Sequence, residues 1–168
     1  MFERFGEFDS AEELNRAAEA QKAEGDEQAL VSIAKENGID VEDAEDFMDG
    51  VVEVFTTPLM AATGKLKIES EDIEIDGILS DWKNQIIEMC MDNEDIQIAV
   101  RRKGKRLAEC MARLIRFAFE NKVLVSDKIV NITKVTHNGK EEAMRKPLYL
   151  GIPNRMQTEK IIKEYYLE

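Results

Sequence analysis

One stretch constrains the fold of this chain more than any other, because it combines dense positive charge with a helical hydrophobic repeat. It runs from Arg101 to Phe119 and reads RRKGKRLAECMARLIRFAF. At 3.6 residues per turn its apolar residues share one face and most of its charged residues share the other. The apolar face consists of Leu107, Cys110, Met111, Leu114, Ile115 and Ala118. The pattern predicts an amphipathic helix with one face in a core and a cationic face in water.

A shorter periodic run from Asn93 precedes this helix and ends in three cations, after which Gly104 suits the left-handed conformation that ends a helix. We therefore expect RRKGKR to lie at a junction between two helices, with its charges in water. The basic candidates for binding a partner or nucleic acid are Arg101, Arg102, Lys103, Lys105, Arg106 and Arg113. Alternatively, these side chains only solvate a core helix and pair with acidic neighbours inside the fold.

Charge is divided unevenly along the 168 residues. Residues 1–95 carry 27 Asp or Glu and 7 Lys or Arg, net −20, whereas residues 96–168 carry 8 and 16, net +8. A content of 35% charged and 43% hydrophobic residues is typical of a globular protein with a heavily ionised surface. We expect an acidic helical subdomain over residues 1–53 and a main helical domain, with the basic junction, over residues 54–168.

The most acidic predicted helix is the segment VEDAEDFMDG, which Asp40 caps. Its apolar side is Val41, Ala44, Phe47 and Met48. Its other side carries the acidic candidates for partner binding, which are Asp40, Glu42, Asp43, Glu45, Asp46 and Asp49. The later carboxylates repel one another and the negative end of the helix dipole. Either a cationic partner accounts for them, or they are ordinary solubilising charge.

Capping and periodicity signals recur along the chain, from a capping box at Ser10 to a terminal helix beginning at Asn154. They predict a mainly α fold, a compact domain of seven or eight helices. At most one small β-hairpin is expected, near residues 132–150. There Asn138-Gly139 is a turn signal, and Leu148 to Leu150 is the expected return strand, although a plain loop is an alternative.

The residue types that enzymes need for catalysis are sparse. His137 is the only histidine, and Cys90 and Cys110 each fall on a predicted apolar face, which favours buried free thiols. There is no phosphate-binding glycine loop, and the acidic runs lack the spacing of a calcium loop. We expect no enzyme activity, no cofactor and no metal. Without a membrane-length apolar run or a signal pattern, the expected location is the cytoplasm.

Six segments read together suggest a family. They are MFERFGEFDSAEEL, PLMAATGKL, DGILSDW, AVRRKGKRLAECMARL, LGIP and KIIKEYYL. In order and spacing the chain resembles the PcfK-like proteins of Firmicute conjugative elements and prophages over almost its whole length. It departs from them around Val135 to Lys146, where family members are shorter. Some family members are described as anti-CRISPR proteins that inhibit the RNA-guided type II CRISPR-Cas effector nuclease.

The resemblance implies a protein of a mobile element, in a bacterial host cell, that binds a partner rather than performing a reaction. The first hypothesis is an anti-CRISPR protein that binds the effector nuclease or its guide RNA complex stoichiometrically, with acidic residues in place of phosphates. The alternative is a nucleic-acid-binding accessory of conjugation that uses the basic residues 101–106. A third alternative is a self-associating structural module, in which acidic and basic ends meet head to tail and close into a homodimer only if the geometry is two-fold.

Overall fold

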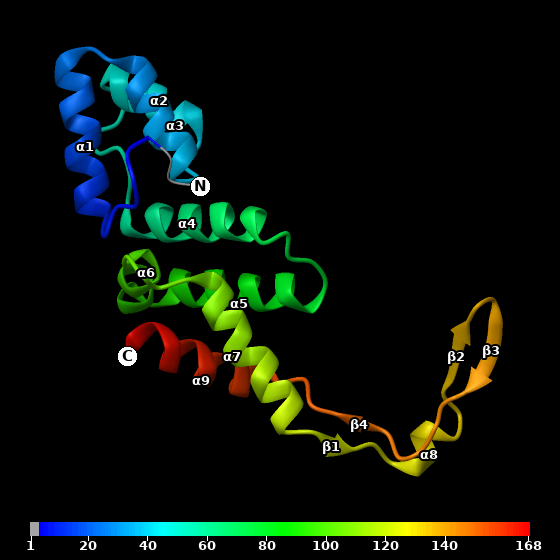
Figure 1. Ribbon diagram of the computed structural model, residues 1–168. Helices are drawn as coiled ribbons and strands as arrows, with labels where there is room; N and C mark the ends of the chain where they lie inside the picture. Colours follow the sequence, from blue (N-terminus) through cyan, green and yellow to red (C-terminus); the bar gives the residue numbers. More distant parts are fainter. Residues whose placement is uncertain (1–3) are drawn as a thin grey trace.

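The structure, a computed structural model that describes residues 4–168, is dominated by helices (Figure 1). Among the described residues the helices are α1 Ala11–Glu24, α2 Glu27–Glu36, α3 Val41–Asp49, α4 Pro58–Asp72, α5 Ile78–Asp92, α6 Glu94–Arg101, α7 Leu107–Glu120, α8 Asp127–Val130 and α9 Arg155–Leu167. The strands are β1 Val123–Leu124, β2 Lys134–His137, β3 Lys140–Ala143 and β4 Tyr149–Leu150. The predicted mainly α fold is confirmed, with nine helices in the described residues rather than seven or eight.

Side chains at the N-termini of the helices satisfy backbone groups that the helices themselves leave unpaired. The Ser10 hydroxyl accepts from the Glu13 amide at 3.2 Å, and the Thr57 hydroxyl accepts from the Met60 amide at 3.2 Å. Asn154 completes a capping box at the start of α9. These caps are local, and they explain why the helix starts could be predicted from sequence.

Two hydrophobic clusters lie on either side of α4. The first, beneath α1, α2 and α3, includes Leu14, Leu30, Ile33, Phe47, Phe55 and Ala61. The second joins α4 to α5, α6, α7 and α9 and includes Leu66, Trp82, Ile86, Val100, Leu114 and Tyr166. We call residues 4–55, which contain α1 to α3, the head. The division at residue 53 into a subdomain and a main domain stays a prediction.

Gly64, inside α4, has no room for a side chain. A Cβ at this position would lie 2.3 Å from the Asn37 carbonyl oxygen, and a Cβ at Gly38 would lie 2.3 Å from the Gly64 carbonyl oxygen. The turn after α2 therefore rests directly on the backbone of α4. A glycine in the helix interior, which normally weakens a helix, here allows the head to approach α4 closely.

Residues 121–153 leave the helical body as an arm (Figure 1). Strand β2 pairs with β3 across a turn in which Asn138 and Gly139 have φ of 49° and 76°, so the predicted turn is confirmed. The expected return strand is wrong, since a two-residue turn pairs the residues directly beside it. Tyr149 and Leu150 instead pair with Leu124 and Val123, forming a second two-stranded sheet at the root of the arm. None of the described helices is long and apolar enough to cross a membrane.

Candidate functional site: an acidic helix face and a buried basic junction

Helix α3 presents carboxylates to water and apolar side chains to the head. Ala44 and Phe47 are 0% and 3% exposed and anchor the helix in the first hydrophobic cluster. The outward side carries Glu42, Glu45, Asp46 and Asp49, which are exposed, with Asp43 half-buried and Asp40 exposed at the N-cap. We call these six residues the acidic face. Its predicted position on one side of a helix follows directly from the helical period.

The acidic face has few positively charged neighbours within residues 4–168. Asp40 lies 3.7 Å from Lys67, and both side chains are largely in water, so this ion pair contributes little. Within residues 4–168, the five other carboxylates of the face form no ion pair. Four exposed carboxylates and the half-buried Asp43 are therefore left without an ion pair on a single helix.

One lysine reduces the electrostatic cost of carboxylates at the negative end of α3. The Lys22 ammonium donates to the Phe47 carbonyl and lies 4.6 Å above the centre of the Phe47 ring. A cation at the carbonyl end of a helix is favoured by the helix dipole. Lys22 thus offsets part of the repulsion from Asp46 and Asp49 without pairing with either carboxylate.

The basic junction is buried more deeply than its charge suggested. Arg101, expected in water, is only 1% exposed, and its Nη2 donates to the Asn37 Oδ1 at 2.7 Å. Asn37 is the C-cap of α2, so the head closes over the last turn of α6. Burial lowers the pKa of Arg101 to about 10, against the opposing effect of Glu7. The expectation that all RRKGKR charges lie in water is therefore wrong for Arg101.

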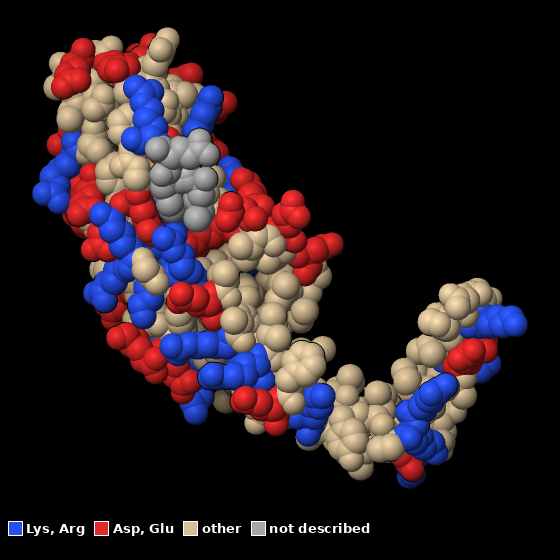
Figure 2. Space-filling view, viewed as in Figure 1, with Lys and Arg blue, Asp and Glu red and all other residues tan. Residues whose placement is uncertain are grey.

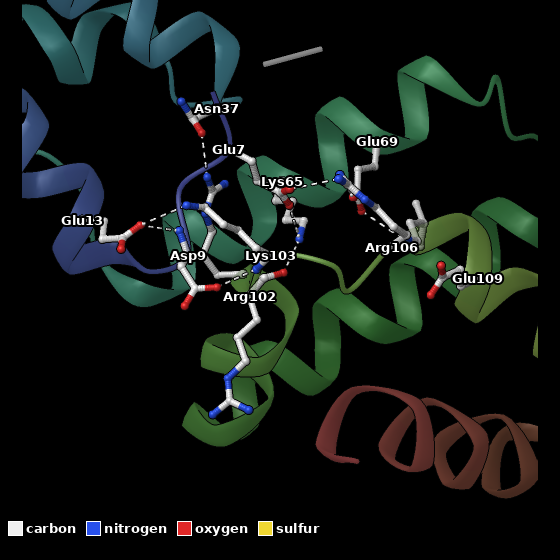
Figure 3. A network of polar contacts seen from close by, with 12 residues as sticks. Glu7, Asp9, Glu13, Asn37, Lys65, Glu69, Arg102, Lys103, Arg106 and Glu109 are labelled. Atoms are coloured by element: carbon white, nitrogen blue, oxygen red, sulfur yellow. Dashed lines mark hydrogen bonds and ion pairs between the residues drawn. The ribbon is translucent and has the colours of Figure 1, made fainter. Parts of the chain in front are cut away.

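The rest of the junction joins a compact cluster of opposite charges (Figure 3). Lys65 lies 3.0 Å from Glu7 and donates to the Arg102 carbonyl at 2.7 Å, with its own side chain fully buried. Arg106 donates to Glu7 at 2.9 Å and lies 3.6 Å from Glu69. We call Glu7, Lys65, Glu69, Arg101 and Arg106 the clasp.

The clasp ties three distant parts of the chain together. Glu69 also accepts from the Leu107 amide at 3.0 Å, so its carboxylate caps the positive end of α7. Burial raises the pKa of Glu69 and lowers the pKa of Lys65, and in each case the opposite charge of the other residue counteracts the shift. Burying the Lys65–Glu7 and Arg106–Glu69 ion pairs costs desolvation energy, so the clasp specifies how the head and body fit more than it adds net stability.

The remaining basic candidates also contact the protein itself. The Lys103 amide donates to Asp9 at 2.8 Å, and its ammonium lies 3.9 Å from Glu13. Lys105 donates to the Tyr165 carbonyl at 2.7 Å. Arg113 donates to Glu168 at 3.1 Å. Of the predicted set, Arg102 and Lys103 keep exposed side chains.

Sequence reasoning missed Glu7, Lys65 and Glu69. A signal for two of them was present, because Ala61, Lys65 and Glu69 are spaced by four and fall on one side of α4. Ala61 is fully buried, and Lys65 and Glu69 follow it at 0% and 4% exposure. Opposite charges four apart on a buried helix face predict an internal ion pair. Glu7 lies outside any helix, and its role depends on the tertiary fold.

Residues for metal or nucleophilic chemistry are not gathered in a site within the described chain. No group of three or more His, Cys, Asp or Glu side chains in residues 4–168 could hold a metal ion. Cys90 and Cys110 are buried free thiols, as predicted, and burial raises the pKa of each to about 12. His137 lies exposed on β2.

Comparison of the chain with family models, with curated proteins and with solved structures finds no match. The acidic face and the clasp therefore have to be interpreted from their own geometry.

Proposed function

We propose that this protein is a stoichiometric inhibitor that binds the nucleic-acid channel of an RNA-guided type II CRISPR-Cas nuclease through its acidic face. The choice of target rests on the resemblance of the six sequence segments to PcfK-like proteins. The mode of binding rests on the charges of α3. No reaction is assigned to the protein itself.

The observation that carries the proposal is the contrast in pairing between the two charged candidates. Of the junction cations, Lys103 pairs with Glu13 and Arg106 pairs with Glu7 and Glu69, whereas five carboxylates of the acidic face have no ion pair within residues 4–168. At the predicted sites, the protein thus offers a partner mainly negative charge that is not in an ion pair, and little such positive charge.

Successive carboxylates on one helix face stand about 5–6 Å apart, so they form a row of anions along α3. A channel that tracks a nucleic-acid backbone is lined with lysines and arginines. Contacts between those cations and carboxylates are charge-assisted and often bidentate with arginine. Such a row can therefore compete with phosphates for the same side chains.

The nucleic-acid-binding alternative is less well supported by the geometry. It depends on residues 101–106, of which Arg101 is buried against Asn37 and Arg106 is paired with Glu7 and Glu69. Few cations are left there to release counterions from DNA or RNA. A gel-shift series at low salt tests it, since retardation that is lost in R102E/K103E would favour this alternative.

The decisive experiment compares two charge reversals in a target-cleavage assay. The test variant is E42K/E45K/D46K/D49K, which reverses four exposed residues of the acidic face. The matched control is E71K/D72K/E74K/D76K, which reverses four exposed carboxylates at the end of α4 and just after it, and changes net charge equally. The proposal expects the test variant to need at least about tenfold more protein for half-inhibition, a loss of about 1.4 kcal/mol, and the control to stay near wild type.

Three other results would overturn parts of the proposal. Equal inhibition by wild type and the test variant would remove the acidic face as the binding surface. Equal losses of inhibition in both variants would mean that the net charge of the protein matters and the position of the acidic face does not. Absence of inhibition by wild type, with no complex recovered on size-exclusion chromatography, would remove the assigned function.

A further inference from the structure

The arm, residues 121–153, exposes many apolar side chains to water. Its most exposed apolar side chain, Ile132, is 81% exposed, and Val123 at the root is 70% exposed. The exposed apolar residues of the arm are Val123, Leu124, Ile129, Ile132, Val135, Tyr149, Leu150 and Ile152. Figure 2 shows this uncharged surface where the arm leaves the body. These eight side chains lie within one segment of 33 residues, and a monomer rarely leaves large contiguous apolar patches uncovered.

The root of the arm is apolar on both sides of its sheet. Val123 lies opposite Leu150, and Leu124 lies opposite Tyr149, so neighbouring pairs face opposite sides. All four side chains are at least half exposed. A two-stranded ribbon without a covering layer is marginally stable in water. Since both faces of this ribbon are apolar and uncovered within the described chain, it needs a further protein surface.

The distribution of charge indicates which protein surface covers the arm. Residues 121–153 carry six Lys or Arg and three Asp or Glu, net +3, and the head, residues 4–55, carries 4 and 16, net −12. In residues 4–168, the arm cations Lys128, Lys140 and Arg145 form no ion pair, and neither do Asp49 and Glu53 of the head. The arm of one molecule and the head of another are therefore electrostatically complementary.

The head also has an apolar acceptor. The segment after α3 exposes Val51 by 70% and Val54 by 53%, with Val52 between them at 38%. Asp49 lies two residues before Val51, and Glu53 lies between Val52 and Val54. An apolar centre with an acidic rim matches an apolar arm with a basic rim.

We propose that this protein forms a two-fold dimer in which the arm of each copy packs on the Val51–Val54 segment of the other copy's head. The head and the arm lie at opposite ends of the helical body (Figure 1). A two-fold axis beside the body, perpendicular to the line from head to arm, places each arm next to the partner's head, and both contacts form at once, so the assembly closes. The dimer requires no nuclease, although its contact includes Asp49 of the acidic face.

Light scattering on the full chain, over a range of concentrations and at two salt concentrations, is the first test. The expected mass is twice the 19.2 kDa of one chain, with weaker association at high salt. A mass of one chain at all concentrations would overturn the dimer. Masses that grow steadily beyond two chains would overturn two-fold closure. If the dimer binds DNA and mutation of the arm abolishes the DNA binding, the assignment of the arm to a protein contact would be overturned.

Complementation of two variants tests the contact itself. The arm variant is V123S/I132S/I152S, the head variant is V51S/V54S, and the control M91S/M156S removes equally exposed apolar groups elsewhere. Each of the first two should dissociate at least about tenfold more readily, with circular dichroism unchanged, and the control should remain dimeric.

Mixed together, the arm and head variants retain one intact arm–head contact. A 1:1 mixture should therefore form heterodimers at concentrations where each variant alone is monomeric. An arm that pairs with the partner's arm predicts instead that the head variant stays dimeric and that mixing restores nothing. Either of those results would overturn the proposal.

Discussion

The acidic face and the clasp are both rich in charge, yet they differ in what surrounds each charge. On α3 the carboxylates are exposed and separated from cations. In the clasp, Lys65 and Arg101 are buried and held by Glu7 and Asn37. Charge in water is free to bind another molecule, whereas charge in the interior has to be paired where it stands. The number of charges in a segment therefore does not say which role they have.

The largest expected effect comes from removing one partner of the clasp. Lys65→Met leaves Glu7 and the Arg102 carbonyl without their buried donor, so the free energy of unfolding should fall by roughly 3–5 kcal/mol. Lys67→Met, which removes the exposed partner of Asp40, should cost under about 1 kcal/mol. Urea denaturation of both variants measures the difference. Equal and small losses would break the distinction between buried and exposed charge.

The next effect concerns how closely the head must approach α4 for the clasp to form. In an exposed helix, Gly→Ala stabilises by up to about 1 kcal/mol. Gly64→Ala should instead destabilise by about 1–3 kcal/mol, because the new Cβ meets the Asn37 carbonyl at 2.3 Å. Thermal unfolding gives the sign directly. A gain in stability would show that the head yields to the added methyl group.

A smaller effect is expected on the acidic face. The variant E45Q/D46N/D49N removes repulsion near the negative end of α3, so the free energy of unfolding should rise by a few tenths of a kcal/mol per residue at low salt. Added salt should erase the gain, since exposed charges are screened. Denaturation at two ionic strengths checks this. A loss of stability would mean that these carboxylates are held by contacts within the fold.

The smallest effect is a pH dependence carried by Glu69. Because burial raises its pKa above the ordinary 4.5, the folded protein holds a proton that the unfolded chain releases. Its contribution to stability is therefore fully present below pH 4.5 and is lost as pH rises through the raised pKa. Glu69→Gln should flatten the decline in unfolding free energy just above pH 4.5. The exposed control Glu71→Gln should leave the wild-type slope, and equal slopes in all three proteins would contradict the buried position of Glu69.

Much of the local structure could be predicted from sequence, since helix caps and hydrophobic periods act over a few residues. Ser10 and Asn154 mark helix starts that the structure confirms. The acidic face also follows from one nine-residue helix. Ile115, however, was placed on the core side of α7 and is 40% exposed. A periodic pattern gives the direction of a side chain but not how far the neighbouring elements extend to cover it.

By itself the sequence determined the helical class, the two buried thiols and the row of carboxylates on α3, because each depends on residues close in the chain. Only the tertiary structure decided the burial of Arg101, whose partner Asn37 lies 64 residues away, and the contact of Glu69 with Leu107, 38 residues apart. It also decided that Val123 pairs with Leu150. Pairings over such distances depend on how whole elements pack, and no local preference for a backbone conformation encodes them.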